Sequence, residues 1–181
     1  MKDVRYIIVD VDGTLTDGSV IIDSEGQETK KFHIADGLGI RLAQEAGLEV
    51  IVLTGRKSAA VTKRMRELKV TRVYQGVANK AQVIAQLKSD LEVVDAQVAY
   101  IGDDINDLPA FAECGVKIAI GDGSPILRER ADYVTRRPGG YGAVREAIEE
   151  ILRVQERLGM AVQSYLASLA QVSPSAPGAV N

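Results

Sequence analysis

Asp10-Val11-Asp12-Gly13-Thr14-Leu15-Thr16-Asp17 is the stretch of sequence that decides the fold, and it directly follows an apolar run at residues 5–9. An apolar run of this length is typical of a buried strand, so the acidic motif begins where the strand ends. Residues i and i+2 of an extended chain point to the same side, which brings the carboxylates of Asp10 and Asp12 together. Gly13 permits the tight departure of the chain that follows. Two carboxylates so close together would repel each other, and a magnesium ion between them would relieve that repulsion, which indicates a metal site. The alternative interpretation of the motif is a turn that merely ends the strand.

The rest of the chain alternates short apolar runs with segments of helical period. The expected strands are residues 5–9, 49–53, 72–74, 97–101 and 116–119, and the expected helices are residues 38–45, 58–68, 80–87, 107–112 and 143–157. Such alternation predicts an α/β fold, in which a parallel sheet is covered by helices on both faces in a Rossmann-like three-layer α/β/α arrangement. Ligands bind beyond the carboxyl ends of the strands in such sheets.

Residues 17–34 break this alternation. Ser19–Ile22 and Thr29–Phe32 flank the turn-rich segment Asp23–Gly26, which predicts a β-hairpin that projects from the carboxyl end of the first strand. We expect one domain over residues 1–158. A C-terminal helix and a frayed tail are expected over residues 159–181. The apolar residues with the spacing of a helix that packs on a partner are Leu158, Val162, Tyr165, Leu166 and Leu169.

Composition limits the possible functions. The chain has 181 residues, of which 46% are hydrophobic and 26% charged, which suits a single globular domain with a full core. The net charge of −3 and the lack of a cluster of basic residues argue against nucleic acid as a partner. The single cysteine, Cys114, is expected to be a packing residue, and the apolar run at residues 6–9 is too short for a signal sequence or a membrane span. We expect a cytoplasmic protein without a membrane partner.

Three further motifs follow expected strands. Thr54-Gly55-Arg56 offers a hydroxyl and backbone N–H groups at the start of a helix, Asn79-Lys80 opens another helix, and Asp103 lies in the acidic stretch at residues 102–107. The hydroxyl and N–H groups suit a phosphoryl oxygen. Taken singly, each motif is more often a helix start, a surface lysine or a helix cap.

Together and in this order, the four motifs resemble the haloacid dehalogenase superfamily over residues 5–135. The resemblance implies that Asp10 is a nucleophile that forms an aspartyl-phosphate and that Asp12 is the general acid and base. It implies that Thr54 and Lys80 bind the transferring phosphoryl group, and that Asp103 completes a magnesium site with Asp10 and Asp12. Asp104 and Asp107 are expected to support the metal site or to cap the helix.

Within this superfamily, the chain is similar to the capless 3-deoxy-D-manno-octulosonate 8-phosphate phosphatases and to relatives that act on nine-carbon sialic-type sugar phosphates. The motifs that carry this similarity are residues 10–18, 31–40, 54–58, 74–76, 79–80 and 102–107. Only the hairpin and one helix separate Asp17 from Thr54, and about 25 residues separate Thr54 from Lys80, so no cap domain fits. The resemblance implies a small phosphorylated sugar acid as substrate, and a homotetramer in which the hairpins assemble centrally.

Several substrate contacts are implied by the same resemblance. Asp12, Lys80, Arg56 and Arg64 are expected to bind the substrate, and Lys31, His33 and Asp36 to lie near its pocket. Three of these residues have a structural alternative: Arg64 on a solvated helix face, His33 as a structural residue in a strand-like segment, and Asp36 as the cap of a helix that begins near Gly37. The loop Pro138–Gly142 either covers a neighbouring site or forms a turn before the last helix.

Two other functional classes fit parts of the pattern. A phosphotransferase or phosphomutase would use the same aspartyl-phosphate, although an uncapped site favours transfer to water. A catalytically silent phosphatase-like module would have no need of Asp10, Asp12, Lys80 and Asp103 together. The expected activity is therefore magnesium-dependent hydrolysis, with an eight-carbon sugar acid phosphate as the first candidate substrate and a nine-carbon one as the alternative.

Overall fold

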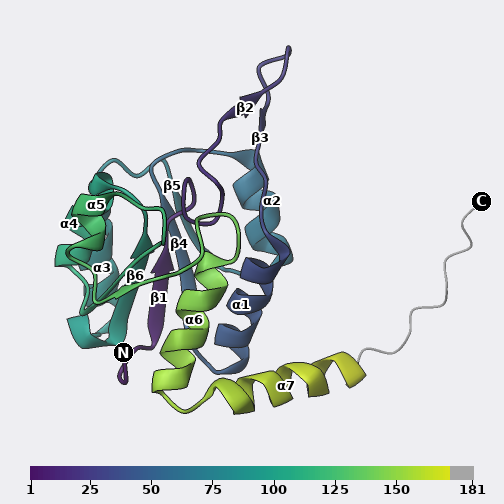
Figure 1. Cartoon of the computed structure of the whole chain (residues 1–181), viewed down its shortest axis with the longest axis vertical. Helices are drawn as coiled ribbons and strands as arrows, with labels where there is room; N and C mark the ends of the chain where they lie inside the picture. The colour runs from purple at the N-terminus through teal and green to yellow at the C-terminus, as the bar shows by residue number, and fades with distance from the viewer. Residues whose placement is uncertain (172–181) are drawn as a thin grey trace, which may run out of the picture.

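The structure is a computed structural model that describes residues 1–171 (Figure 1). Its main sheet has six strands in the order β5-β4-β1-β6-β7-β8, and all neighbouring pairs are parallel. The strands are β1 (Tyr6–Val9), β4 (Glu49–Thr54), β5 (Arg72–Gln75), β6 (Val98–Gly102), β7 (Val116–Ala119) and β8 (Tyr133–Val134). The predicted parallel sheet is confirmed, and only the two-residue edge strand β8 had no sequence signal strong enough to predict it.

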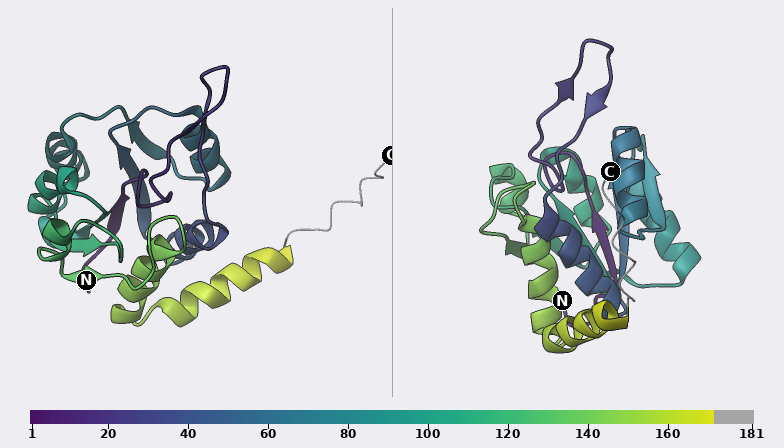
Figure 2. Two further views of the ribbon diagram at one scale, coloured as in Figure 1. Left: turned by 45° about the horizontal axis from the view of Figure 1, so that its top comes forward. Right: turned by 90° about the vertical axis from the view of Figure 1, so that its right-hand side faces the viewer.

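Helices cover both faces of the sheet, as predicted (Figure 2). They are α1 (Ile34–Glu45), α2 (Ala59–Glu67), α3 (Lys80–Leu91), α4 (Leu108–Ala112), α5 (Pro125–Arg128), α6 (Ala143–Val154) and α7 (Leu158–Gln171), with 3-10 helices η1 (Asp95–Gln97) and η2 (Ile105–Asp107). Ile7 and Val9 of β1 join a core with α1, α2 and α6, whereas Ile8 joins a second core with α3, α4 and α5. Because successive side chains of a strand point to opposite faces of the sheet, β1 contributes to the core on both faces.

The register of the central strands determines where the site lies. Val9 at the end of β1 pairs with Val52 of β4 on one side and with Ile101 of β6 on the other. The three strands therefore end at one edge of the sheet, so that the segments that follow them meet there. The fold places the motifs at residues 10–17, 54–56 and 102–107 together by this register alone.

The predicted hairpin is present and projects from the body of the molecule (Figures 1 and 2). Its strands are β2 (Ile21–Ile22) and β3 (Glu28–Thr29), which pair antiparallel. The side chain of Asp23 accepts hydrogen bonds from the backbone N–H groups of Glu25 and Gln27 at 2.9 and 2.8 Å, which closes the turn. Ile21 and Ile22 are more than half exposed within this chain.

Helix α1 begins earlier than the sequence predicts, directly after His33. The alternation of polar and apolar residues before Ile34 resembles a strand, but His33 is the N-cap of α1. Its Nδ1 accepts a hydrogen bond from the backbone N–H of Ala35 at 3.2 Å. The backbone of His33 is extended as expected, but its side chain caps a helix that begins at the next residue, which agrees with the structural alternative for His33.

Asp36 has a role that the sequence did not predict. Its side chain is buried, and its two oxygens accept hydrogen bonds from the backbone N–H groups of Gly142 and Arg145 at 3.1 and 2.9 Å. Gly142 and Arg145 begin α6, so Asp36 caps α6 across the molecule and does not cap α1. Because both oxygens are occupied, the expectation that Asp36 faces the substrate is not supported by this arrangement.

We expect Asp36→Ala to lower the free energy of unfolding by about 1–3 kcal/mol, because two buried N–H groups lose their acceptor. Urea unfolding of the variant and of wild type would measure the loss. An increase in KM with unchanged stability would contradict the structural role and return Asp36 to the substrate pocket.

Helix α7 lies where the C-terminal helix is expected, and part of its apolar face is covered by this chain. Ala161 is buried, and Leu158, Val162 and Tyr165 pack against the core that contains α1 and α6. Leu166 and Leu169 stay half exposed. Residues 172–181, where a frayed tail is expected, lie outside the described residues. Among residues 1–171, no helix combines the length and apolar character required to cross a membrane.

Candidate active site

The site begins with Asp10, which follows β1 directly and is 3% exposed. Its backbone N–H donates to the carbonyl of Ile101 at 3.0 Å, which fixes it against the neighbouring strand. Its Oδ2 lies 3.1 Å from Lys80 Nζ, while its Oδ1 is buried and has no hydrogen-bond partner. Asp10 thus presents one free oxygen beside a buried cation.

Lys80 comes to Asp10 from the first turn of α3. Asn79 caps this helix by accepting a hydrogen bond from the N–H of Gln82 at 3.1 Å, which directs the lysine toward the sheet edge. The side chain of Lys80 is 5% exposed, and its Nζ also lies 2.6 Å from Asp107 Oδ1. The alternative of a solvated surface lysine is therefore wrong.

Asp107 holds this arrangement together. It is fully buried and accepts hydrogen bonds from Lys80, from the Tyr100 hydroxyl at 2.6 Å and from the backbone N–H groups of Asp103 and Asp104 at 3.0 and 3.4 Å. Asp104 in turn caps η2 through the N–H of Ile105. The supporting role expected for these two residues is consistent with their contacts, whereas no sequence motif points to Tyr100.

Three carboxylates lie close enough to share a cation. Oxygen atoms of Asp10, Asp103 and Asp107 are all within 4.8 Å of one another. Thr14 orients Asp103 by donating its hydroxyl hydrogen to Oδ1 at 3.0 Å. Because hard cations such as magnesium prefer carboxylate oxygens, and because Asp10 retains a free oxygen, these residues fit a divalent ion.

Asp12 lies apart from that cluster, which differs from the prediction. Its Oδ1 forms an ion pair with Lys30 of the hairpin, and its Oδ2 is buried without a hydrogen-bond partner. β1 ends at Val9, so the chain is no longer extended at Asp12 and the two side chains diverge. The carboxylate of Asp12 is therefore not in the three-carboxylate cluster, although it remains beside the site.

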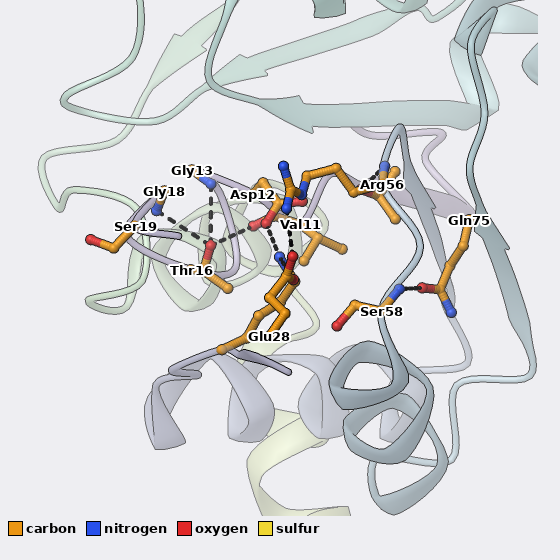
Figure 3. A network of polar contacts seen from close by, with 12 residues as sticks. Val11, Asp12, Gly13, Thr16, Gly18, Ser19, Glu28, Arg56, Ser58 and Gln75 are labelled. Atoms are coloured by element: carbon orange, nitrogen blue, oxygen red, sulfur yellow. Dashed lines mark hydrogen bonds and ion pairs between the residues drawn. The ribbon is translucent and has the colours of Figure 1, made fainter. Parts of the chain in front are cut away.

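An ionic network that the sequence analysis missed continues from Asp12. Lys30, whose side chain is 2% exposed, also lies 2.8 Å from Glu28 Oε1, in a geometry that makes an ion pair but no hydrogen bond. Glu28 Oε2 pairs with Arg56 at 2.5 Å (Figure 3). The available signal was the spacing of Glu28 and Lys30, since residues i and i+2 of an extended chain share one face.

The remaining predicted residues occupy different surroundings. Thr54 is buried at the end of β4, and its Oγ1 accepts from the N–H of Arg56 at 3.4 Å. Arg64 pairs with Glu67 on α2 at 3.2 Å, which agrees with the alternative of a helix-face charge. Lys31 is half exposed and pairs with Asp17 at 2.6 Å.

The loop Pro138–Gly142 packs on the motif that begins the site. The Tyr141 hydroxyl lies 3.0 Å from Lys31 Nζ, and the N–H of Gly140 donates to the carbonyl of Thr14 at 3.1 Å. A Cβ atom at Gly139 would come within 1.7 Å of the Gly13 carbonyl oxygen, so only glycine fits there. The loop therefore braces the turn at residues 13–17 of its own chain.

Burial and neighbouring charges raise the pKa of two acids of the cluster, Asp10 and Asp103. Burial raises the pKa of Asp10 to about 6, with a further contribution from repulsion by Asp107, although Lys80 opposes the rise. Burial and repulsion by Asp10 raise the pKa of Asp103 to about 7. Without a cation, the cluster therefore retains protons near neutral pH.

Stability should consequently depend on pH and metal together. In the unfolded chain Asp10 and Asp103 have the usual pKa of 3.8, and in the folded chain their pKa values are about 6 and 7. At pH values between these limits, the folded chain therefore binds more protons than the unfolded chain. The free energy of unfolding of the metal-free protein therefore falls as pH rises through this interval. Magnesium should raise Tm more at pH 8 than at pH 5, as measured by thermal unfolding with magnesium or with a chelator. An equal rise at both pH values would contradict a metal site at these acids.

A separate cavity of about 610 Å³ lies between α6 and β8. It is lined by Arg145, Arg153, Glu149 and Glu150 among others, and these charges pair with one another, Arg145 with Glu149 and Arg153 with Glu150. Its lining does not include the residues of the candidate site, which are Asp10, Asp12, Thr54, Lys80, Asp103 and Asp107. The chemistry is therefore assigned to the sheet edge, where the reactive groups are.

Fold and site together define a haloacid dehalogenase-like hydrolase, and the family model described as haloacid dehalogenase-like hydrolase matches residues 70–148. The chain is 42% identical to 3-deoxy-D-manno-octulosonate 8-phosphate phosphatase KdsC of Escherichia coli K12 over 157 residues, which cover 87% of this chain and 84% of the relative. The chain belongs to the 3-deoxy-D-manno-octulosonate 8-phosphate phosphatase family. The predicted family and the class of enzyme are confirmed.

Solved structures support the same assignment. The phosphatase of this name from Moraxella catarrhalis, in complex with magnesium, phosphate and KDO, superposes with a TM-score of 0.87 at 38% identity, and the match covers 91% of this chain and 94% of that one. A putative hydrolase of the superfamily's subfamily III A from Legionella pneumophila has a TM-score of 0.89 at 40% identity, with 92% and 91% coverage. The predicted Rossmann-like α/β/α architecture is confirmed by these neighbours.

Proposed function

We propose that the protein hydrolyses 3-deoxy-D-manno-octulosonate 8-phosphate to 3-deoxy-D-manno-octulosonate and phosphate. The observation that carries the proposal is the buried Asp10 at the end of β1, with one free oxygen and with Lys80 and Asp103 beside it. The names of the similar relatives supply the substrate. The same site would serve a nine-carbon sugar acid 9-phosphate, which is the second candidate because the phosphate-binding residues do not contact the sugar.

The reaction has two steps in this proposal. Asp10 Oδ attacks phosphorus and forms an aspartyl-phosphate, while the bond from phosphorus to the sugar oxygen breaks and Asp12 donates a proton to that oxygen. Asp12 then takes a proton from water, whose oxygen attacks phosphorus and breaks the bond to Asp10. Phosphate leaves and both aspartates return to their starting state.

Magnesium belongs to this proposal as the cofactor. Asp10 and Asp103 would hold it, since Asp107 already accepts four hydrogen bonds and the Asp12 carboxylate faces Lys30. When bound, such an ion neutralises the charge of the phosphoryl oxygens. Lys80 supplies a second positive charge there, and the hydroxyl of Thr54 binds a phosphoryl oxygen.

Arg56 is the proposed partner of the sugar acid's carboxylate, because its guanidinium is half exposed beside the site. Lys31 would lie at the edge of the same pocket through its contact with Tyr141. Arg64 would reach the substrate only by leaving its ion pair with Glu67.

A homotetramer in the cytoplasm is the proposed working form. The exposed Ile21 and Ile22 of the projecting hairpin support an assembly, because such a hairpin leaves apolar side chains and strand edges uncovered in one chain. Residues 1–158 would form the hydrolase domain, with residues 159–171 as a helix that extends it.

A substrate panel tests the proposal. Phosphate release with magnesium should be fastest from the eight-carbon sugar acid phosphate, slower from nine-carbon sugar acid phosphates and slowest from hexose phosphates. A preference for hexose phosphates would refute the substrate while leaving the chemistry intact. Phosphate transfer to an added sugar instead of water would indicate a phosphotransferase, and no turnover of any ester would indicate a silent module.

A further inference from the structure

The hairpin places a carboxylate where the proposed substrate would place its own. Glu28 of β3 lies between two cations, with Oε1 2.8 Å from Lys30 Nζ and Oε2 2.5 Å from Arg56 (Figure 3). These two contacts lower the pKa of Glu28 to about 2, with the close contact to Lys30 as the largest cause and the contact to Arg56 next. Arg56 is the residue proposed above to bind the sugar acid's carboxylate. Glu28 therefore already pairs with the guanidinium that the substrate's carboxylate would need.

Charge balance around the pocket shows why this matters. Asp12, Lys30, Glu28 and Arg56 form one connected network, and at its exposed end the charges of Glu28 and Arg56 cancel each other. An incoming carboxylate meets no excess positive charge there. The substrate's carboxylate can form an ion pair with Arg56 only when the ion pair between Glu28 and Arg56 breaks.

The two ends of the network differ in how readily they open. Lys30 is 2% exposed and contacts both Asp12 and Glu28, whereas Arg56 is 49% exposed and has only the Glu28 contact among the described ion pairs. An exposed ion pair contributes little stability, so the Arg56 end opens first. Since each oxygen of Glu28 serves a different cation, Glu28 can release Arg56 and remain paired with Lys30.

Polar atoms without partners lie beside this network. Asp12 Oδ2 and the hydroxyl oxygen of Ser58 are buried and lack hydrogen bonds, although the N–H of Ser58 donates to Gln75 at 2.8 Å (Figure 3). Buried polar atoms normally have partners, so a ligand with hydroxyl groups would satisfy them. A polyhydroxylated sugar acid has both features, hydroxyls for these atoms and a carboxylate for Arg56.

We propose that Glu28 is a specificity-determining residue that competes with the substrate's carboxylate for Arg56. The proposal rests on the proposed function, because it takes a sugar acid phosphate as the substrate. Glu28 holds Arg56 in place in the unliganded chain and releases it to an acidic sugar. A phosphate ester of a neutral sugar leaves the Glu28 and Arg56 pair intact, so the residue affects acidic and neutral substrates differently.

The test is Glu28→Gln, which preserves size and removes the charge. KM for the sugar acid phosphate, divided by KM for a neutral sugar phosphate, should fall by about two- to fivefold, the equivalent of one exposed ion pair. The free sugar acid, titrated by calorimetry without turnover, should bind more tightly by a similar factor. Glu25→Gln is the matched control on the exposed turn of the same hairpin, and its ratio should equal that of wild type.

Two results would overturn the proposal. An unchanged ratio would mean that Glu28 does not compete for Arg56, and a raised ratio would mean that Glu28 orients Arg56 for the substrate. If Glu28→Gln does not fold, Glu28→Asp keeps the charge but shortens its reach, and the ratio should fall in the same direction. Wild type that rejects sugar acid phosphates would refute the proposed function instead, and the calorimetric titration would still decide the role of Glu28.

Discussion

Replacing Asp10 with asparagine is expected to lower kcat by about 10³-fold or more, because the amide cannot form the covalent bond to phosphorus. Asn has nearly the same shape, so KM should change far less than kcat. Phosphate release under saturating substrate and magnesium measures the effect. A variant with near-normal turnover would remove Asp10 from the role of nucleophile.

Unfolding cannot account for this expected loss. Burial and repulsion by Asp107 already raise the pKa of Asp10, so the folded chain favours a neutral group at this position when no metal is bound. Lys80 keeps its contact with Asp107 in the variant. Thermal unfolding of metal-free Asp10→Asn at pH 8 should therefore give a Tm equal to or above that of wild type.

The second large effect is expected for Lys80→Met. Its ammonium is 5% exposed and is the cation shared by Asp10 and Asp107, so removal leaves buried carboxylates without a partner. Removing one partner of a buried ion pair typically costs about 3–5 kcal/mol of stability. Loss of positive charge at the phosphoryl group should lower kcat/KM by about 10²–10³-fold as well.

The pH dependence of the stability loss in Lys80→Met distinguishes removal of the positive charge from simple loss of packing. Lys80 opposes the rise in the pKa of Asp10 and Asp103, so without Lys80 these two acids retain protons to higher pH. The loss of stability should therefore be greater at pH 8 than at pH 5. Lys88→Met is the control from the same helix, since Lys88 pairs with Asp95 and Glu113 near the surface. It should cost about 1 kcal/mol or less and leave kcat/KM near wild type. Equal losses for the two variants would contradict the proposed role of Lys80.

The site residues that follow the strands could be predicted from the sequence, because a parallel sheet brings the carboxyl ends of its strands to one edge. Once residues 5–9, 49–53 and 97–101 are taken as neighbouring parallel strands, Asp10, Thr54 and Asp103 must arrive at one edge. Lys80 needed a further step, which the Asn79 cap supplies by fixing where α3 begins. The positions of these residues could be predicted because they follow from local sequence motifs and from the register of the parallel strands.

Long-range side-chain contacts could not be predicted in this way. Asp36 caps a helix more than one hundred positions away, and Tyr100 reaches Asp107 from inside a buried strand. Asp12 turns from the predicted metal cluster to Lys30 because the chain leaves its extended path after Val9. Such contacts depend on how separate elements pack, which periodicity and spacing do not specify.

The covalent step at Asp10 is the central claim, and trapping the phosphorylated enzyme tests it most directly. Wild type would be mixed with magnesium and sugar acid phosphate carrying ³²P, quenched in acid within the first turnover, and digested to peptides. Label should be found on the peptide that contains Asp10 in wild type, and it should be absent from Asp10→Asn. Rapid phosphate release from wild type without protein-bound label at any quench time would contradict the account.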